Sequence, residues 1–587
     1  MMKRTDRYIL WLAAFCLNIF MLEAQTDTIT RVVQVEREFQ PVITAAGKLD
    51  VKPQFYETQT EPAKISFSEY SQSLEPANSE LNTLGWAPTN FIMPTPLNGF
   101  LRAGIGHPHS LFDFNYRLTE KRSLSLNLNA HHHGQWGKKT LAHSSLGMDI
   151  NKLFNKTELF FGVNAENIFL TRYGRYFRYT DTGKMTGNWQ GLNSYSDFTA
   201  DDKNAQWEVM TRLGVRSLPD ADIKYLVQTG YEPFIMKHNT VEHTVNTQGM
   251  FEWQKNTHHV GANLHVENHI YTFDHAETKA FYAAHPGLYN NNDSTKTDYH
   301  AVKLEPYYAY NGRRFSIHAG VNLDFCIGKG KLFLPSPEVT FEAKLTKNWL
   351  ALYGGAVGEY ATSSVREHFS YLRYLHAENE ITTQNNRTYT PVRAFLGFKI
   401  RPHADLLIDI HAQYQYTKYD VFFRPEADGS ANPTGYFNLV SKPYQLWQIA
   451  AAFNYHYQDI VFFTLDGFYN IWKMQERTDY AGLPVNHILD RPTWGVNLRV
   501  DGKIDSKWSL YTVMYFSGGR YALDLNTTLT AVALKPVIDL NLGGQYNINK
   551  WLSCYLQVCN LLNRKHDVFY GYQSQGINFM IGITYAF

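Results

Sequence analysis

The densest group of side chains that could carry out chemistry is a run of three histidines, His131, His132 and His133. Imidazole is the commonest metal ligand in proteins. On an extended strand, however, His131 and His133 lie on one face and His132 on the other, so a metal ion would meet at most two of them. The sequence places no carboxylate or cysteine beside the run. We therefore interpret it as a polar strand end, and we interpret His258 and His259, beside a turn, in the same way.

Sequence motifs for catalysis and for cofactor binding are absent. The chain contains no HExxH zinc motif, no GxSxG elbow, no Walker loop and no glycine-rich dinucleotide turn. Its Asp and Arg residues are scattered, and we interpret them as the lining of a wet interior. We therefore expect no catalytic residues, no cofactor and no bound metal, and we do not expect an enzyme.

Cysteine usage argues against a disulfide framework. Cys16 lies in an N-terminal apolar stretch that we expect to be removed, which leaves Cys326, Cys554 and Cys559. Three is an odd and small number for an exported chain. Cys554 and Cys559 are five residues apart, which on one strand puts them on opposite faces. We therefore expect no disulfide between them.

Composition and charge exclude several classes of protein. The chain has 587 residues, with 55 Lys and Arg against 54 Asp and Glu, so its formal net charge is +1. A nucleic-acid-binding protein would show a basic excess, so we expect no nucleic-acid partner. Mean hydropathy is −0.36, yet aromatic residues make up 15% of the chain. Such a mixture is typical of sheets with one wet face and one apolar face.

Residues 1–24 have the pattern of a secretory signal peptide. Three basic residues precede an apolar stretch over 8–21, and a small residue, Ala24, follows. The stretch is too short for a transmembrane helix. We predict cleavage between Ala24 and Gln25, and export of the mature chain.

Residues 25–97 differ in composition from the rest of the mature chain. They contain 7 of the 22 prolines. Proline fixes φ and removes a backbone donor, so this stretch cannot form a continuous helix or sheet. We interpret it either as an extended, partly ordered N-terminal segment in the periplasm or lumen, or as a flexible leader.

Residues 98–587 alternate between apolar and polar side chains. The alternation is clear over 112–118, 408–416 and 538–542, and it marks strands with one apolar face. Most segments run ten to fifteen residues by rough count, whereas a tilted strand needs about 9–11 to cross a bilayer. Polar-in, apolar-out segments of this length are typical of an outer-membrane barrel. We therefore predict an all-β, antiparallel transmembrane β-barrel in the cell outer membrane.

The connections between these segments alternate between short and long, as they do in barrels with periplasmic turns and external loops. We count about 22 strands, with 18–22 as the range, and an even number returns both ends to the periplasm. The long connections cover roughly 169–203, 274–296, 361–390, 421–441 and 475–490.

The alternation also predicts which side chains face lipid. In one strand, Leu540 should face lipid while Asp539 and Asn541 face the lumen, so replacement of Asn541 should be mild. The closing strand ends on an aromatic residue, and we predict that one of its faces is the C-terminal signal read by the barrel insertion machinery. That face comprises Ile577, Phe579, Ile581, Ile583, Tyr585 and Phe587.

Three stretches resemble TonB-dependent receptors. The run NLLNRKHDVFYGYQSQGINFMIGITYAF over 560–587 resembles the end of those barrels, and LPSPEVTFE over 334–342 resembles one of their strand openings. Residues 27–33 resemble the short motif that engages the energy-transducing protein. The resemblance implies a 22-stranded barrel that transports solute. The family's folded plug, however, is larger than 25–97 can provide, so we expect the plug to be absent.

A barrel of this width would leave an open channel unless something fills it. Within 364–378, Val365, Phe369, Leu372 and Leu375 have helical spacing. This pattern indicates either a helix that folds over or into the mouth, or an irregular external loop. We expect the lumen to be narrowed by 361–390 together with part of 25–97, or by a partner protein.

Two classes of function remain open on the sequence alone. The first is a receptor or channel that carries solute across the outer membrane. The second is a non-transporting subunit of an outer-membrane assembly or export complex, tethered through residues 25–97. The expected partners are membrane lipid, the insertion machinery, and an energy-transducing or assembly partner in the periplasm.

Overall fold

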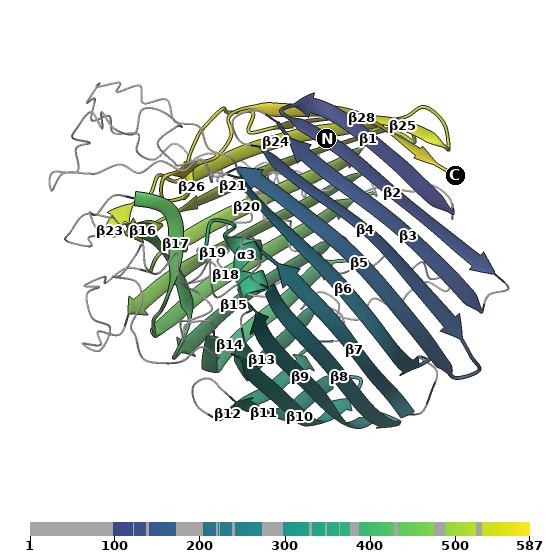
Figure 1. The fold of residues 1–587 in the computed structure, drawn as a ribbon. Coiled ribbons are helices and arrows are strands. Elements are labelled where there is room, and N and C mark those ends of the chain that lie inside the picture. Colours follow the sequence, from purple (N-terminus) through teal and green to yellow (C-terminus); the bar gives the residue numbers. More distant parts are fainter. Residues whose placement is uncertain are drawn as a thin grey trace, which may run out of the picture. The chain divides into compact units, whose positions relative to one another are not determined.

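The barrel is a single antiparallel sheet of 22 strands that closes on itself (Figure 1). Each strand pairs with the next barrel strand along the chain, and the last strand, β28, pairs with the first, β1. The all-β fold and the strand number are therefore confirmed. The computed structural model describes residues 98–587 apart from 121–122, 137–139, 172–202, 219–220, 222, 237–240, 273–297, 328–331, 347–348, 363, 376–386, 428–432, 459, 475–487 and 524–530.

The first half of the barrel consists of the strands from β1 to β13. Its strands are β1 (Gly99–His107), β2 (His109–Glu120), β3 (Leu124–Gln135), β4 (Leu141–Leu153), β5 (Thr157–Thr171), β6 (Lys203–Ser217), β7 (Ile223–Ile235), β8 (Val241–Lys255), β9 (His258–Thr272), β10 (Tyr299–Asn311), β11 (Phe315–Ile327), β12 (Phe333–Lys344) and β13 (Leu350–Thr362).

In the second half, the described residues include a helix and three small hairpins between the barrel strands. Its barrel strands are β14 (Arg387–His403), β15 (Leu406–Thr417), β18 (Tyr444–Tyr457), β19 (Val461–Met474), β20 (Trp494–Lys503), β21 (Trp508–Gly518), β24 (Val537–Asn547), β25 (Leu552–Cys559) and β28 (Asn578–Ala586). The helix α3 (Val365–Tyr371) precedes β14, and the hairpins are β16 (Val421–Ala427) with β17 (Pro433–Ser441), β22 (Tyr521–Leu523) with β23 (Ala531–Ala533), and β26 (Asp567–Phe569) with β27 (Tyr572–Gln573).

The long connections lie at one end of the barrel, which we call the loop end, and the other end, the turn end, has only short ones. Connections at the turn end are two to five residues long. The two ends of the barrel sequence meet there, because the backbone of Gly99 exchanges two 2.9 Å hydrogen bonds with that of Phe587. Long connections at the loop end include all five that the sequence predicted. Two more, after β21 and after β25, were not predicted.

The two faces of the sheet alternate as the sequence predicted. In β28, Phe579, Ile581 and Ile583 are each about half exposed on the outer face, whereas Met580 and Thr584 on the inner face are 2% exposed. The outer side chains form rows across neighbouring strands, so that Ile581 is paired with exposed residues of β1 and β25. Such rows make the apolar band that lipid requires.

Three further expectations from the sequence concern the cysteines, membrane-spanning helices and the N-terminal segment. Among the described residues, Cys326, Cys554 and Cys559 form no disulfide. No helix among the described residues is long and apolar enough to span a membrane. The predicted cleavage site between Ala24 and Gln25, and the motif at 27–33, lie outside the described residues.

The structure gives a reason to expect a larger effect for replacing Asn541 than the alternation alone suggested. Asn541 faces inward as predicted, but it is only 1% exposed. Its Oδ1 accepts the backbone N–H of Asn560 at 2.9 Å, and its Nδ2 donates to Asp539 at 3.2 Å. Removing this side chain would leave a buried N–H without its acceptor, which is costly. The alternation predicted the face, but it carried no information on this contact.

We expect arginine to be tolerated on the inner face of the barrel but not on the outer face. Ile581→Arg puts a charge into lipid and should lower the free energy of unfolding by about 2–4 kcal/mol near the midplane. The matched control is Gln228→Arg, on the inner face of β7, where Gln228 donates to Gln248 at 2.7 Å. It should cost well under half as much. Reversible unfolding in lipid vesicles measures both, and equal costs would contradict the assignment of faces.

Candidate functional site

The connection between β13 and β14 contains the helix α3, which begins at a complete capping box. The N–H of Glu367 donates to Ser364 Oγ at 3.1 Å, and the N–H of Ser364 donates to Glu367 Oε2 at 3.0 Å. This exchange satisfies two amides that the first helical turn would leave unpaired. The helix expected within 364–378 is therefore present, although it ends at Tyr371.

One side of α3 is anchored to a part of the wall several strands away around the ring. The guanidinium of Arg366 contacts Glu208 of β6 at 2.6 Å and Glu232 of β7 at 3.0 Å. The N–H of Arg366 donates to Glu242 of β8 at 3.1 Å. Because the chain reaches α3 from β13 and leaves it for β14, these contacts carry the helix into the interior of the barrel (Figure 1).

The chain that follows α3 is held by two of the hairpins. The carbonyl of Tyr374 accepts the N–H of Phe437 in β17 at 3.0 Å. The Tyr374 ring stacks on that of Tyr572 in β27, with ring centroids 4.1 Å apart. Residues 364–375 therefore run from the wall at β6–β8 to the hairpins after β15 and β25, and we call this segment the strut.

An apolar cluster joins the strut to the loops around it. It includes Val365 and Leu372 of the strut, Phe437 and Tyr572 of the hairpins, and Phe234 at the end of β7, none more than 3% exposed. Packing of this kind is characteristic of a folded core, in which each side chain excludes water from its neighbours. We call the strut and the three hairpins the loop cap, because together they form an apolar core at the loop end.

Buried arginines connect the separate loops of the cap. Arg520, which is 1% exposed, donates to the carbonyls of Asp567 at 2.5 Å and Val568 at 3.1 Å. Arg491 pairs with Asp420 at 2.6 Å. In each case one guanidinium spans two connections that are far apart in sequence. A rigid fork with several donors suits this role, because it can satisfy carbonyls and carboxylates together.

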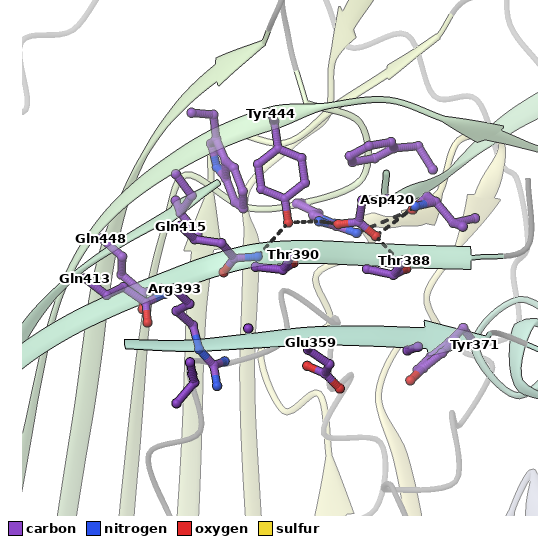
Figure 2. A pocket seen from close by; sticks show the side chains of 18 of the residues that line it. Glu359, Tyr371, Thr388, Thr390, Arg393, Gln413, Gln415, Asp420, Tyr444 and Gln448 are labelled. Carbon is purple, nitrogen blue, oxygen red and sulfur yellow. Dashed lines mark hydrogen bonds and ion pairs between the residues drawn. The ribbon is translucent and has the colours of Figure 1, made fainter. Parts of the chain in front are cut away.

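A cavity of about 580 Å³ lies against the strut on the side of β10–β19. Figure 2 shows its polar side chains, including Arg393, Gln413, Gln448 and Glu359. Tyr371 of α3 lines the cavity on the cap side. Ligand-binding pockets usually measure about 300–1,000 Å³, so a small organic molecule would fit.

Part of the cavity lining is an ordered hydrogen-bonded network. The hydroxyl of Tyr444 accepts hydrogen bonds from Gln415 Nε2 at 3.2 Å and from Arg491 Nη1 at 3.1 Å. Arg491 Nη1 also donates to Asp420 at 2.6 Å, and Figure 2 shows Asp420 and Tyr444 on the same side of the cavity. These contacts fix the wall at the start of β18 against the cap.

The histidines that the sequence singled out lie outside this cavity. His131 pairs with Asp113 on the neighbouring strand β2, and His132 contacts Ser144 at 2.8 Å on the opposite face. His259 contacts Glu252 at 3.3 Å. A carboxylate therefore does lie beside the run, across the sheet rather than along the chain. Among the described residues no group of three or more His, Cys, Asp or Glu is arranged to hold a metal ion.

Sequence reasoning located the strut but missed its anchors and the cavity. The interpretation of 364–378 rested on its apolar spacing, which says nothing of the polar contacts of Arg366. The cavity is made by strands and loops that are distant in sequence, so no local pattern marks it. The C-terminal signal face, Ile577, Phe579, Ile581, Ile583, Tyr585 and Phe587, lies away from both, on the closing strand.

A closed, even-numbered barrel with short turns at one end and long loops at the other is an outer-membrane β-barrel. Solved structures with a similar fold indicate which kind of outer-membrane barrel this is. The chain resembles a mutant of the ferric enterobactin receptor of Pseudomonas aeruginosa (14% identity, TM-score 0.60, covering 83% of this chain and 80% of that chain). It also resembles the siderophore receptor PirA of Acinetobacter baumannii (10% identity, TM-score 0.62, covering 83% of this chain and 80% of that chain). A third similar structure is pyoverdine-bound FpvA of P. aeruginosa (12% identity, TM-score 0.60, covering 84% of this chain and 72% of that chain).

These similarities identify the fold. The chain has the barrel fold of TonB-dependent siderophore receptors, as the resemblance of 560–587 and 334–342 implied. The sequence itself matches no protein-family model, and no curated relative matches it. At 10–14% identity the ligands of those receptors cannot be transferred to this chain.

We expect Arg366→Ala to release the strut from the wall. The substitution removes the cation that faces Glu208 and Glu232, so the remaining carboxylates repel one another. Chymotrypsin cleavage after Phe369 or Tyr374 in the purified protein should then become faster by about tenfold or more, which corresponds to a loss of about 1.4 kcal/mol. The control is Arg216→Ala, which breaks the pair with Glu158 in β5, outside the cap. Unchanged cleavage in Arg366→Ala would contradict the anchoring.

Two buried groups in α3 should give the strut opposite responses to pH. Burial raises the pKa of Glu367 from 4.5 to about 7, so its contribution to stability is full below pH 4.5 and is lost as the pH rises toward 7. Burial lowers the pKa of His368 from 6.5 to about 4, so its contribution is full above pH 6.5 and is lost as the pH falls toward 4.

Removing either group should therefore expose the response of the other. Between pH 4.5 and 6.5, Glu367→Gln should make the strut more stable as the pH rises, and His368→Asn should make it less stable. Hydrogen exchange of 364–375, corrected for the intrinsic pH dependence of exchange, measures both. Slopes of the same sign in the two variants would show that these two groups do not govern the strut.

Proposed function

We propose that the protein is an outer-membrane transport barrel whose loop cap acts as its gate. The observation that carries this proposal is the strut, a structured segment that crosses the lumen of a barrel wide enough to need closing. Beneath it lies a cavity large enough to hold a ligand. A barrel with a polar lumen, a closed mouth and an internal cavity has the parts that a receptor for small solutes needs.

The anchors of the strut suit a gate that opens and closes. At β6–β8 they are ion pairs, and the side chains of Arg366, Glu208 and Glu232 are 14–25% exposed. Val365 of the strut and Phe234 of β7 pack in the apolar cluster at the same end. Opening the gate there would therefore break both polar and apolar contacts.

The remaining parts of the proposal concern export and energy. The mature chain would begin at Gln25 and enter the outer membrane through the insertion machinery, which would read the outward face of β28. Residues 27–33 would engage an energy-transducing partner in the periplasm. Residues 25–97 would form a periplasmic or lumenal segment too small for a plug, so that the loop cap would take over the closing role.

We expect replacement of 364–375 by a glycine-serine linker of equal length to open the barrel. The cap would lose the contacts that cross the lumen, so single-channel conductance in planar bilayers and uptake of a small hydrophilic dye by cells should both increase severalfold. The control is a glycine-serine insertion at the turn between β20 and β21, which lies at the other end of the barrel. It should leave both quantities unchanged.

One observation favours the alternative function, a non-transporting subunit: the apolar core of the loop cap is fully buried at two positions of the strut. Val365 and Leu372 have no exposed surface, as in a closure that is permanent. If the linker variant forms a folded barrel and neither conductance nor uptake changes, the transport proposal is wrong. The chain would then be better explained as a non-transporting subunit of an assembly or export complex, tethered through residues 25–97. Partners that co-purify with the intact chain would support that alternative.

A further inference from the structure

The cavity beside the strut contains two opposite charges, neither of which forms an ion pair or hydrogen bond within the described part of the chain. They are Glu359 of β13 and Arg393 of β14. Other charges of the lining are paired, such as Asp420 with Arg491. Figure 2 shows Glu359 and Arg393 projecting to the same side of their strands. The cavity therefore offers one anionic and one cationic group to a ligand.

The offset of these two residues along the wall follows from the register of their strands. Arg393 is paired with Val357, and Glu359 lies two residues further along β13, past an irregularity in the ladder. Two residues of extended strand correspond to about 7 Å of backbone. The termini of an extended peptide of two or three residues are separated by about 7–10 Å. The length of such a peptide is therefore of the same order as the backbone offset between the two residues.

Two buried amides offer the groups that a peptide bond needs. Gln413 of β15 and Gln448 of β18 face each other directly across the sheet and are 4% and 3% exposed. Gln413 Nε2 is a donor and Gln448 Oε1 an acceptor, and neither atom has a partner among the described residues. Buried polar atoms are normally hydrogen-bonded. A donor and an acceptor side by side match the C=O and N–H of a peptide group.

The rest of the lining distinguishes between classes of ligand. Tyr371, Phe422 and Trp472 provide aromatic surface for an apolar side chain. The further carboxylates of Glu338, Glu367 and Asp490 disfavour a ligand with a large negative charge. A short peptide has no net charge and carries both kinds of terminal group, so it fits this lining better than an anionic chelate.

We infer that the cavity binds a short zwitterionic peptide of two or three residues. Arg393 accepts its carboxylate, Glu359 its ammonium, and the Gln413–Gln448 pair a peptide group. The inference rests on the proposed transport function and assigns a ligand class to it. Arginine suits the carboxylate because its guanidinium can donate two parallel hydrogen bonds.

The test uses capped and uncapped peptides with the purified full-length chain in detergent. Isothermal titration should detect binding of trialanine. Arg393→Gln should weaken trialanine binding about tenfold or more, but should change the affinity for trialanine amide less than about twofold, because the amide lacks the carboxylate. Glu359→Gln should weaken trialanine binding in the same way, and should leave N-acetyl-trialanine nearly unaffected.

The matched control variants are Arg216→Gln and Glu158→Gln, which break an ion pair outside the cap. Both should leave the affinities for all three peptides unchanged. The inference fails if trialanine does not bind the unmodified chain, or if each variant weakens capped and uncapped peptides equally. It also fails if spermidine binds more tightly than trialanine and is insensitive to Arg393→Gln, since that would indicate a site for cations. The linker experiment on the strut needs no ligand, so it would still decide the transport function.

Discussion

The satisfaction of backbone hydrogen bonds in lipid is the constraint on which the rest of this structure depends. Lipid offers no partner for an N–H or a C=O, so a sheet that crosses the membrane must close. Closure with 22 strands encloses more space than inward side chains can fill. Among the described residues, the strut and the three hairpins occupy part of that space. The cavity lies between these loops and the wall of the barrel.

The loop cap combines two kinds of contact that resist separation differently. Its apolar cluster excludes water and gathers the strut with the hairpins. Its ion pairs at β6–β8 hold the strut to the wall at side chains that water still reaches. Buried guanidinium groups such as Arg520 join loops through carbonyls, which fixes geometry more than it adds stability. The cap is therefore attached to the wall by polar and apolar contacts together, because Phe234 of β7 belongs to the same cluster.

Most of the fold could be predicted from the sequence, because alternation with period two is a local property and each strand displays it separately. Less of the cap could be predicted. The connections after β21 and β25 contain hairpins whose strands are only two or three residues long, which is too short to show the alternation of apolar and polar side chains. Contacts across the sheet were also invisible, as with Asp113 beside His131 and Asn560 beside Asn541. Those pairs depend on register, which no single strand encodes.

The same distinction explains why the cavity escaped sequence analysis although each of its strands was predicted. Gln413 and Gln448 read as ordinary polar positions of two alternating strands. Their importance arises only because β15 and β18 become neighbours once the connection between them folds into the cap, and because their facing amides keep a donor and an acceptor without partners. Polar atoms buried in this way lower stability unless something binds them. Among the described residues these two atoms lie without partners in a cavity that Glu359 and Arg393 also line, and this combination is the basis for the inferred ligand.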